Sequence, residues 1–238
     1  MPLISIVVPC YNEAKNIPHL VDSFKKLENF HKGDIELLLV DNGSSDDTFE
    51  IITRLACENS FIKKVKVDVN IGYGNGIIEG VKLAQSRYIS WTHADLQSDP
   101  MDFSRGIDEI NNSKTEFLFI KGARKNRPKI DAFFTFFMSV YVSALFGRLI
   151  NDISAQPTIF HRSLIDGREN DLPKDFALDM YVFILAKKLK FSVKRFNVCF
   201  KKRLHGNSSW NTGAAARIKL IKRYIFLAFK TKISGLKV

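Results

Sequence analysis

Short runs of apolar, largely β-branched residues recur along the first half of the chain, and a polar cluster follows most of them. Unbroken runs of this kind are typical of strands buried on both faces of a sheet. The runs cover residues 3–8, 35–40, 65–67, 87–91 and 117–120. Between them, apolar residues recur at helical spacing, as in Ile17, Leu20, Val21, Phe24 and Leu27. This alternation predicts an α/β fold with one mostly parallel sheet flanked by helices.

The second half of the chain has a different pattern. Residues 130–150 are dense in aromatic side chains, but Thr135, Ser139 and Ser143 form a polar stripe. This favours an interfacial or core helix over one that spans a membrane. After Gly213 the chain reads as a basic amphipathic helix, which is either a solvated helix or a segment that docks on anionic lipid.

Composition narrows the class of partner. The chain has 238 residues, 45% hydrophobic, with a net charge of +11, which indicates a globular protein with an anionic partner. Nucleic acid, a phosphorylated small molecule and an anionic membrane all fit. Three dispersed cysteines form neither a zinc motif nor a disulfide framework, as in a reducing cytoplasm. Residues 1–9 lack the features of a signal peptide, so we expect a cytosolic or cytosol-facing protein.

Polar residues cluster where three of the predicted strands end, at residues 9–13, 41–47 and 93–99. Ligands of open parallel sheets bind beyond the carboxyl ends of the strands. We therefore expect these three clusters to meet at one crevice. Asp46 or Asp47 is also placed to cap the helix that follows the second strand.

Four segments carry a resemblance to a known family: ISIVVPCYNEAKNI, ELLLVDNGSSDDT, NIGYGNGIIEGVKLA and HADLQSDP. In this order and at these spacings, they resemble glycosyltransferase family 2, whose members have the GT-A fold. The subgroup most resembled contains the dolichyl-phosphate mannose synthases and bacterial polyprenyl-phosphate glycosyltransferases. The resemblance implies a nucleotide-sugar-binding part in residues 1–125 and an acceptor-binding part in residues 126–212. A basic amphipathic tail, residues 213–238, would follow.

The resemblance also implies which residues bind the nucleotide. These are Pro9, Tyr11, Glu13, Asp41, Gly74, Asn75, His93 and Ala94. Structural alternatives are a helix-capping turn for Glu13 and a turn cap for Asp41. The glycines around Gly74 follow the third strand rather than the first, which argues against a dinucleotide-binding fingerprint and hence against an oxidoreductase.

Asp95 is the strongest candidate for metal binding and catalysis. It matches the second aspartate of the family's Asp-x-Asp signature, which holds a divalent ion on the diphosphate. His93 stands in place of the first aspartate, and Gln97 follows. The predicted ligand set is therefore Asp95, Gln97 and His93, and the predicted cofactor is Mg²⁺ or Mn²⁺, with imidazole suiting Mn²⁺ better. A purely structural, hydrogen-bonded histidine is the alternative for His93.

The resemblance implies contacts to phosphate or acceptor from Arg124, Arg127, Gln156, Arg203, His205 and Ser208. Arg124 belongs to a Gly-x-Arg motif and is also a candidate catalytic residue. Asp179 occupies the place of an acidic residue that faces the active site in the family. The loop at residues 151–157 ends in Gln-Pro where the family has Gly-Phe, so acceptor specificity could differ. In the segment that closes over the phosphates in the family, Ser209 replaces a lysine.

These features favour an inverting glycosyltransferase. It would move a sugar from a UDP- or GDP-sugar to a membrane-associated acceptor, above all polyprenyl phosphate. One alternative is transfer to a saccharide hydroxyl in surface polysaccharide synthesis, with Asp179 as base. Another is a non-catalytic nucleotide-sugar-binding protein. Clustered acids at the strand ends argue against nucleic-acid binding. We expect a cytoplasmic protein peripherally associated with the membrane face, and the sequence leaves a homo-oligomer open.

Overall fold

The computed structural model describes residues 1–125, 129–199, 201 and 214–234. The strands are β1 (Ile4–Cys10), β2 (Ile35–Asn42), β3 (Ile62–Val67), β4 (Tyr88–Trp91), β5 (Leu118–Lys125), β6 (Thr158–His161) and β7 (Ser192–Cys199). The α-helices are α1 (Ile17–Phe30), α2 (Thr48–Glu58), α3 (Tyr73–Leu83), α4 (Asp102–Asn112), α5 (Lys129–Phe146), α6 (Ala177–Lys188) and α7 (Ala214–Ser234). Two short 3₁₀ turns, Arg162–Leu164 and Glu169–Asp171, lie between β6 and α6.

The strands form one sheet in the order β3-β2-β1-β4-β6-β5-β7. All neighbours are parallel except β6, which runs antiparallel between β4 and β5. The prediction of an α/β fold with a mostly parallel sheet is confirmed. The sequence pattern did not predict β6, β7, α4 or α6. β6 has only four residues, and β7, at the sheet edge, is half-exposed and lacks an unbroken apolar run.

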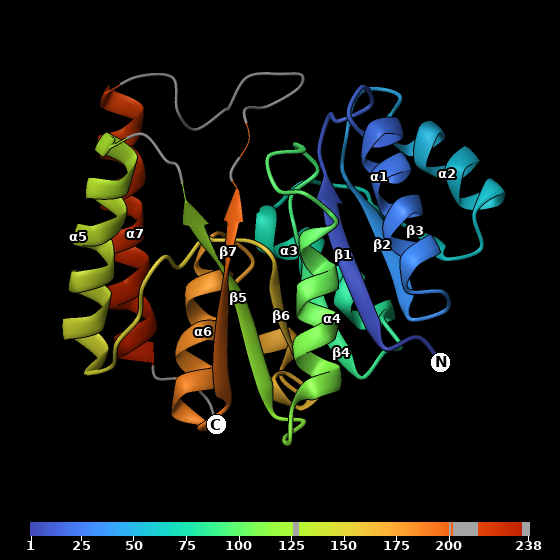
Figure 1. Ribbon diagram of the computed structural model, residues 1–238. Helices are drawn as coiled ribbons and strands as arrows, with labels where there is room; N and C mark the ends of the chain where they lie inside the picture. Colours follow the sequence, from blue (N-terminus) through green and yellow to red (C-terminus); the bar gives the residue numbers. More distant parts are fainter. Residues whose placement is uncertain (126–128, 200, 202–213, 235–238) are drawn as a thin grey trace.

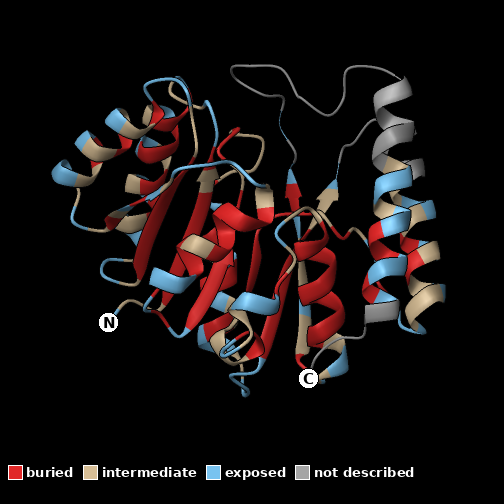
Figure 2. Cartoon of the chain, turned by 180° about the vertical axis from the view of Figure 1, so that it is seen from behind, coloured by how far each residue is buried: buried red, intermediate tan, exposed pale blue. Residues whose placement is uncertain are grey.

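Helices cover both faces of the sheet (Figures 1 and 2). The side chains of β1 show how, because Ile4, Ile6 and Val8 pack into a cluster with α1, α2 and α4. Val7 packs on the other face, in a cluster that includes α3 and α6. The sheet is buried on both faces over β1 and β2, which explains their continuous apolar sequence.

The helices α5 and α7 lie side by side at one end of the molecule (Figure 1). Val142 of α5 and Leu227 and Ala228 of α7 are buried in the same cluster as α6. The predicted aromatic helix over 130–150 ends earlier, at Phe146, where Gly147 takes a φ of +64°. The C-terminal basic segment is helical, as expected, and it packs on the rest of the fold.

The polar stripe of α5 binds the chain that follows the helix. The Ser143 hydroxyl accepts a hydrogen bond from the backbone N–H of Ile150 at 2.9 Å, and the Ser139 hydroxyl accepts one from that of Asp152 at 3.2 Å. The stripe therefore fixes the loop that leads to β6. Over the residues described, no helix has the length and apolar character needed to cross a membrane.

Candidate functional site

Hydrogen bonds fasten the loop after β1 to the loop after β2. The backbone N–H of Asn12 donates to the Ser44 hydroxyl at 3.0 Å, and the Asn12 side-chain carbonyl accepts from the backbone N–H of Ser45 at 2.9 Å. Asn12 has a φ of +54°, a conformation that asparagine tolerates better than most residues. The two loops therefore form one edge at the carboxyl ends of β1 and β2, with Pro9 at the end of β1 and the Tyr11 ring half-exposed beside it.

The acidic residues of these loops also support the turns themselves. The buried Asp41 carboxylate accepts from the Ser44 N–H at 3.0 Å, which is the turn-capping contact considered as an alternative for it. The Glu13 carboxylate accepts from the Asn16 side chain next to the start of α1. Asp47 occupies the N-cap position of α2 without a side-chain cap bond, and the Asp46 carboxylate before it accepts from the Thr48 N–H at 3.2 Å. The predicted contacts of Asp41 and Glu13 with a nucleotide stay predictions.

The glycine turn at the start of α3 approaches another part of the chain. A Cβ placed on Gly74 would lie 2.4 Å from the carbonyl oxygen of Pro173, too close for any side chain. The N–H of the buried Asn75 donates to the carbonyl of Lys174 at 3.0 Å. The close approach that these glycines permit is thus made to backbone at residues 173–175. Their predicted contact with the nucleotide stays a prediction.

Asp95 lies in a tight turn just beyond β4 and is buried. Its Oδ1 accepts from the backbone N–H of Gln97 at 3.1 Å across Leu96, which has a φ of +59°. The Gln97 side-chain amide donates to the carbonyl of Lys201 at 3.1 Å. Ala94 is buried in the core, so that only its backbone is available to a ligand. The turn holds the Asp95 carboxylate in a defined place at the strand end.

The resemblance noted in the sequence implies a divalent metal ion at this turn. The residues present provide some, but not all, of the ligands that such an ion needs. Within the described part of the chain, no three His, Cys, Asp or Glu side chains gather closely enough to hold a metal ion by themselves. However, Mg²⁺ and similar ions commonly bind through one or two carboxylates together with substrate phosphates. Asp95 provides one such carboxylate, with His93 two residues before it. The donor set therefore suits an ion that arrives with a diphosphate.

An aromatic stack connects this turn to the C-terminal helix. The His93 and Tyr73 ring centroids lie 5.3 Å apart, and Tyr73 stacks on Phe176 at 5.1 Å. The Arg223 guanidinium of α7 lies 5.9 Å from the centre of the Phe176 ring. The His93 ring therefore packs against Tyr73. Its predicted roles as a metal ligand and a nucleotide contact stay predictions. The sequence analysis missed Tyr73, Phe176 and Arg223, because an isolated aromatic residue gives no signal of its partners.

Two tyrosine hydroxyls point into the same region. The buried Tyr73 hydroxyl finds no hydrogen-bond partner among the described residues. Burial, followed by the acidic groups of Asp179, Tyr224 and Asp95, raises the pKa of Tyr73 well above its usual value. The Tyr224 hydroxyl lies 2.9 Å from that of Ser154, and burial raises the pKa of Tyr224 to about 12. Both groups stay neutral and can donate hydrogen bonds at physiological pH.

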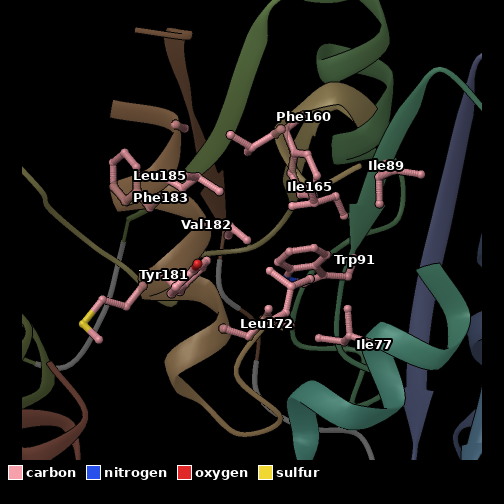
Figure 3. Packing of buried hydrophobic residues seen from close by; sticks show 14 of the residues in the cluster. Ile77, Ile89, Trp91, Phe160, Ile165, Leu172, Tyr181, Val182, Phe183 and Leu185 are labelled. Carbon is pink, nitrogen blue, oxygen red and sulfur yellow. The ribbon is translucent and has the colours of Figure 1, made fainter. Parts of the chain in front are cut away.

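Asp179 lies in the first turn of α6 and is almost fully buried. Trp91 donates to its Oδ1 from Nε1 at 3.0 Å, and Gln156 donates to the same oxygen from Nε2 at 3.2 Å. Figure 3 shows the Trp91 ring among apolar side chains of α3 and α6, including Ile77 and Val182. Because Trp91 ends β4, its indole connects Asp179 to the strand that leads to Asp95.

A lysine that the sequence analysis missed completes this network. Lys121 of β5 is 0% exposed, and its Nζ lies 3.7 Å from Oδ1 of Asp179. The same Nζ donates to the Thr158 hydroxyl at 2.6 Å. Burial lowers the pKa of Lys121 from its usual 10.5 to about 8, against the opposing effect of the Asp179 carboxylate. The sequence does contain a signal that could have found this residue: a lysine stands inside the apolar run at residues 117–122, and a charge buried in such a run needs a partner.

Arg124, at the end of β5, forms an ion pair with Asp152. Its Nε donates to Oδ1 of Asp152 at 2.9 Å, and its backbone N–H donates to Oδ2 at 3.0 Å. Two predicted motifs, Gly-x-Arg and the 151–157 loop, therefore meet in space. The remaining predicted contacts, Arg127, Arg203, His205 and Ser208, lie outside the described residues.

The geometry thus gathers Asp95, Asp179, Lys121 and two tyrosines at the carboxyl edge of one α/β sheet. Residues 5–161, more than half of the chain, match the family model described as "Glycosyl transferase family 2". The chain belongs to glycosyltransferase family 2. The predicted family is confirmed, and the motifs at residues 4–17, 36–48, 70–84 and 93–100 all lie in the matched region or overlap it.

Curated relatives include transferases named for polyprenyl phosphates. The undecaprenyl-phosphate 4-deoxy-4-formamido-L-arabinose transferase of Proteus mirabilis is 27% identical over 172 residues, covering 68% of this chain and 50% of the relative. The dodecaprenyl-phosphate galacturonate synthase of Rhizobium johnstonii is 29% identical over 167 residues, covering 68% and 48%. The chain therefore spans about half the length of the curated relatives it matches.

Solved structures share the fold at low sequence identity. Glucosyl-3-phosphoglycerate synthase from Mycobacterium tuberculosis, in complex with Mn²⁺, UDP and glucosyl-3-phosphoglycerate, superposes with a TM-score of 0.70 at 18% identity, covering 97% of this chain and 80% of that one. A mannosyltransferase from Pyrobaculum calidifontis, in complex with GDP-mannose and Mn²⁺, gives 0.70 at 16% identity, covering 100% and 66%. These structures confirm the predicted GT-A fold.

Proposed function

We propose that this chain transfers a sugar from a UDP- or GDP-sugar to polyprenyl phosphate, with inversion at the anomeric carbon. The observation that carries the proposal is the presence of two buried carboxylates, Asp95 and Asp179, near the same Tyr73 hydroxyl in a family 2 fold. Trp91 connects them, since its indole donates to Asp179 and its strand leads into the turn of Asp95. The similarity to transferases named for undecaprenyl and dodecaprenyl phosphates supports the choice of acceptor.

The donor would occupy the crevice at the carboxyl ends of the strands. Tyr11, Glu13 and Asp41 would hold the base and ribose, and Asp95 would face the diphosphate together with His93 and Gln97. A bound Mg²⁺ or Mn²⁺ supplies charge neutralisation for the departing nucleoside diphosphate. Arg124, held by Asp152, would contribute a fixed cation near the phosphates.

A phosphate acceptor changes what the protein must provide. Its oxygen is already anionic, so it needs positioning and charge compensation more than a general base. The family's cations at residues 124, 127 and 203 would serve this purpose, with Gln156, His205 and Ser208 as further contacts. A net charge of +11 agrees with an anionic acceptor in an anionic surface.

The outer surfaces of α5 and α7 suit a membrane face. Exposed aromatic side chains and exposed cations lie on these adjacent helices: Phe136, Phe137, Phe226, Phe229, Lys222, Arg223, Lys230 and Lys232. Aromatic and basic side chains together are typical of helices that lie in a membrane interface. We propose peripheral association with the cytoplasmic face of a membrane, where a polyprenyl phosphate would be presented.

One observation favours a second acceptor class, a saccharide hydroxyl. Two hydrogen-bond donors and the Lys121 ammonium converge on Oδ1 of Asp179, whereas Oδ2 accepts no hydrogen bond from the described residues. An open, fixed carboxylate oxygen is what a base for a hydroxyl acceptor requires. If the acceptor is a hydroxyl, Asp179→Asn should abolish transfer; if it is a phosphate, the same variant should retain measurable transfer.

The test is a panel of UDP- and GDP-sugars with Mn²⁺ or Mg²⁺, each offered a short-chain polyprenyl phosphate or an oligosaccharide. Product carrying the sugar on phosphate, formed by the wild type and by Asp179→Asn at reduced rate, supports the first proposal. Product on saccharide alone, lost in Asp179→Asn, supports the second. Absence of transfer from every donor to either acceptor would contradict both.

A further inference from the structure

Lys121 is the most unusual charged group of the described chain, because no part of it reaches solvent. It stands in β5 between Ile120 and Gly122, and its side chain reaches Asp179 of α6. A buried, unpaired ammonium is strongly disfavoured, so its position must be stabilised by the groups around it. The nearest are the Thr158 hydroxyl, at 2.6 Å, and Oδ1 of Asp179, at 3.7 Å.

The arrangement at Asp179 separates its two oxygens. Trp91, Gln156 and Lys121 all face Oδ1. Two hydrogen bonds and one ammonium on the same oxygen fix the plane and the rotamer of the carboxylate, and no described residue donates to Oδ2. The neutral Tyr73 hydroxyl lies close enough to Asp179 for the charge of the Asp179 carboxylate to raise the pKa of Tyr73. A hydroxyl of the substrate could therefore meet Oδ2 as acceptor and the Tyr73 hydroxyl as donor.

We propose that Lys121 is a positioning residue for the transfer reaction: its ammonium faces Oδ1 of the Asp179 carboxylate and keeps Oδ2 directed to a substrate hydroxyl. This rests on the proposed function. The hydroxyl belongs either to the donor sugar or to a saccharide acceptor, and the chemistry of recognition is the same for both. Without the ammonium, the buried carboxylate would lose the cation beside Oδ1, and its orientation would depend on Trp91 and Gln156 alone among the described residues.

The pairing predicts a particular pH dependence. The charged groups that act on Lys121 are Asp179 of α6, Arg195 of β7, Asp152 of the loop before β6, and Arg124 of β5 itself. Burial dominates over all of them and lowers the pKa of Lys121 to about 8. The ammonium is therefore present below pH 8 and lost above it. Sugar transfer should decline as the pH rises through this value, until it reaches the rate of a protein that lacks the ammonium.

The experiment compares initial transfer rates of wild type, Lys121→Met and Lys63→Met between pH 6 and 9.5. Lys63 is a matched control, because it also pairs with a buried carboxylate, Glu36, but at the opposite ends of the strands. We expect wild type and Lys63→Met to decline together above pH 8. Lys121→Met should have a low rate at every pH, equal to the rate that wild type approaches above pH 8, and should show no such decline.

Folding and acceptor are controlled in the same series. Lys121→Gln, which can still donate to the Thr158 hydroxyl, replaces the methionine variant if that one fails to fold, and carries the same expectation. A pH effect seen with polyprenyl phosphate assigns the hydroxyl to the donor sugar; an effect seen only with a saccharide assigns it to the acceptor. If Lys121→Met loses the same fraction of activity at every pH, the lysine is only structural and the inference is wrong. If the wild type transfers no sugar, the proposed function fails first and the inference with it.

Discussion

Replacing Lys121 by methionine should change how the stability of the fold depends on pH. Lys121 is completely buried, and its pKa is lowered by burial from 10.5 to about 8. Between these values the unfolded chain binds a proton at this position and the folded chain does not. The free energy of unfolding must therefore rise with pH across this window. Below pH 8 both states carry the proton, and above pH 10.5 neither does, so the effect is confined to the window.

The size of the effect follows from the shift. The pKa of Lys121 is 10.5 in the unfolded chain and about 8 in the folded chain, and this difference corresponds to a rise of about 3 kcal/mol in the free energy of unfolding between pH 8 and pH 10.5. The methionine variant lacks this contribution, because it has no group that titrates here. Within the window, wild type has itself lost the ammonium beside Asp179, so the missing cation does not distinguish the two proteins there. The difference between the two proteins should therefore grow in favour of wild type as the pH rises.

The assay is urea unfolding of both proteins at pH 7.5, 9 and 10.5, with the free energy extrapolated to water. Other lysines and tyrosines also titrate at high pH, but they are common to both proteins and cancel in the difference. Lys63→Met, whose lysine is partly exposed, should run parallel to wild type. Parallel curves for wild type and Lys121→Met would mean that the ammonium is not desolvated in solution, and the reasoning would be refuted.

The remaining predictions concern the metal and the membrane. Asp95→Ala should lower the transfer rate on the order of 10²–10³-fold with unchanged thermal unfolding. The transfer rate of Asp99→Ala, which removes an exposed partner of Lys201, should stay near that of wild type. Equal rates in the two variants would contradict the role of Asp95. His93→Asp should shift binding preference from Mn²⁺ towards Mg²⁺, measured by titrating both ions with nucleoside diphosphate present; a His93→Ala variant that binds both ions as wild type does would make the histidine structural. Lys222→Glu with Lys230→Glu should weaken binding to anionic vesicles by about 1 kcal/mol per cation in flotation assays. Phe226→Ser should weaken it further, whereas Phe30→Ser, on the exposed side of α1, should not. If wild type stays on the vesicles at every salt concentration, the electrostatic part of this account is wrong.

Local sequence patterns were enough to predict the first half of the fold and the place of the site. Its strands are buried on both faces, so their apolar runs stand out locally, and a change from apolar to polar residues marks each carboxyl end. The positions of Asp41 and Asp95 at these ends followed from that change alone. The motifs around them identified the family, because four short segments in a fixed order are specific even when each segment is not.

Only the tertiary structure decided which groups meet. The pairing of Lys121 with Asp179, and of Arg124 with Asp152, joins segments far apart in the chain, and no local pattern specifies a partner. The glycines at the start of α3 illustrate the same limit. The sequence shows that some other group must approach the backbone of these glycines closely, whereas only the fold shows that this group is the backbone of residues 173–175. β7 escaped prediction because an edge strand is half-exposed and its pattern resembles a loop. Local periodicity reports how deeply an element is buried, but the partner of a buried charge is fixed only when strands and helices pack.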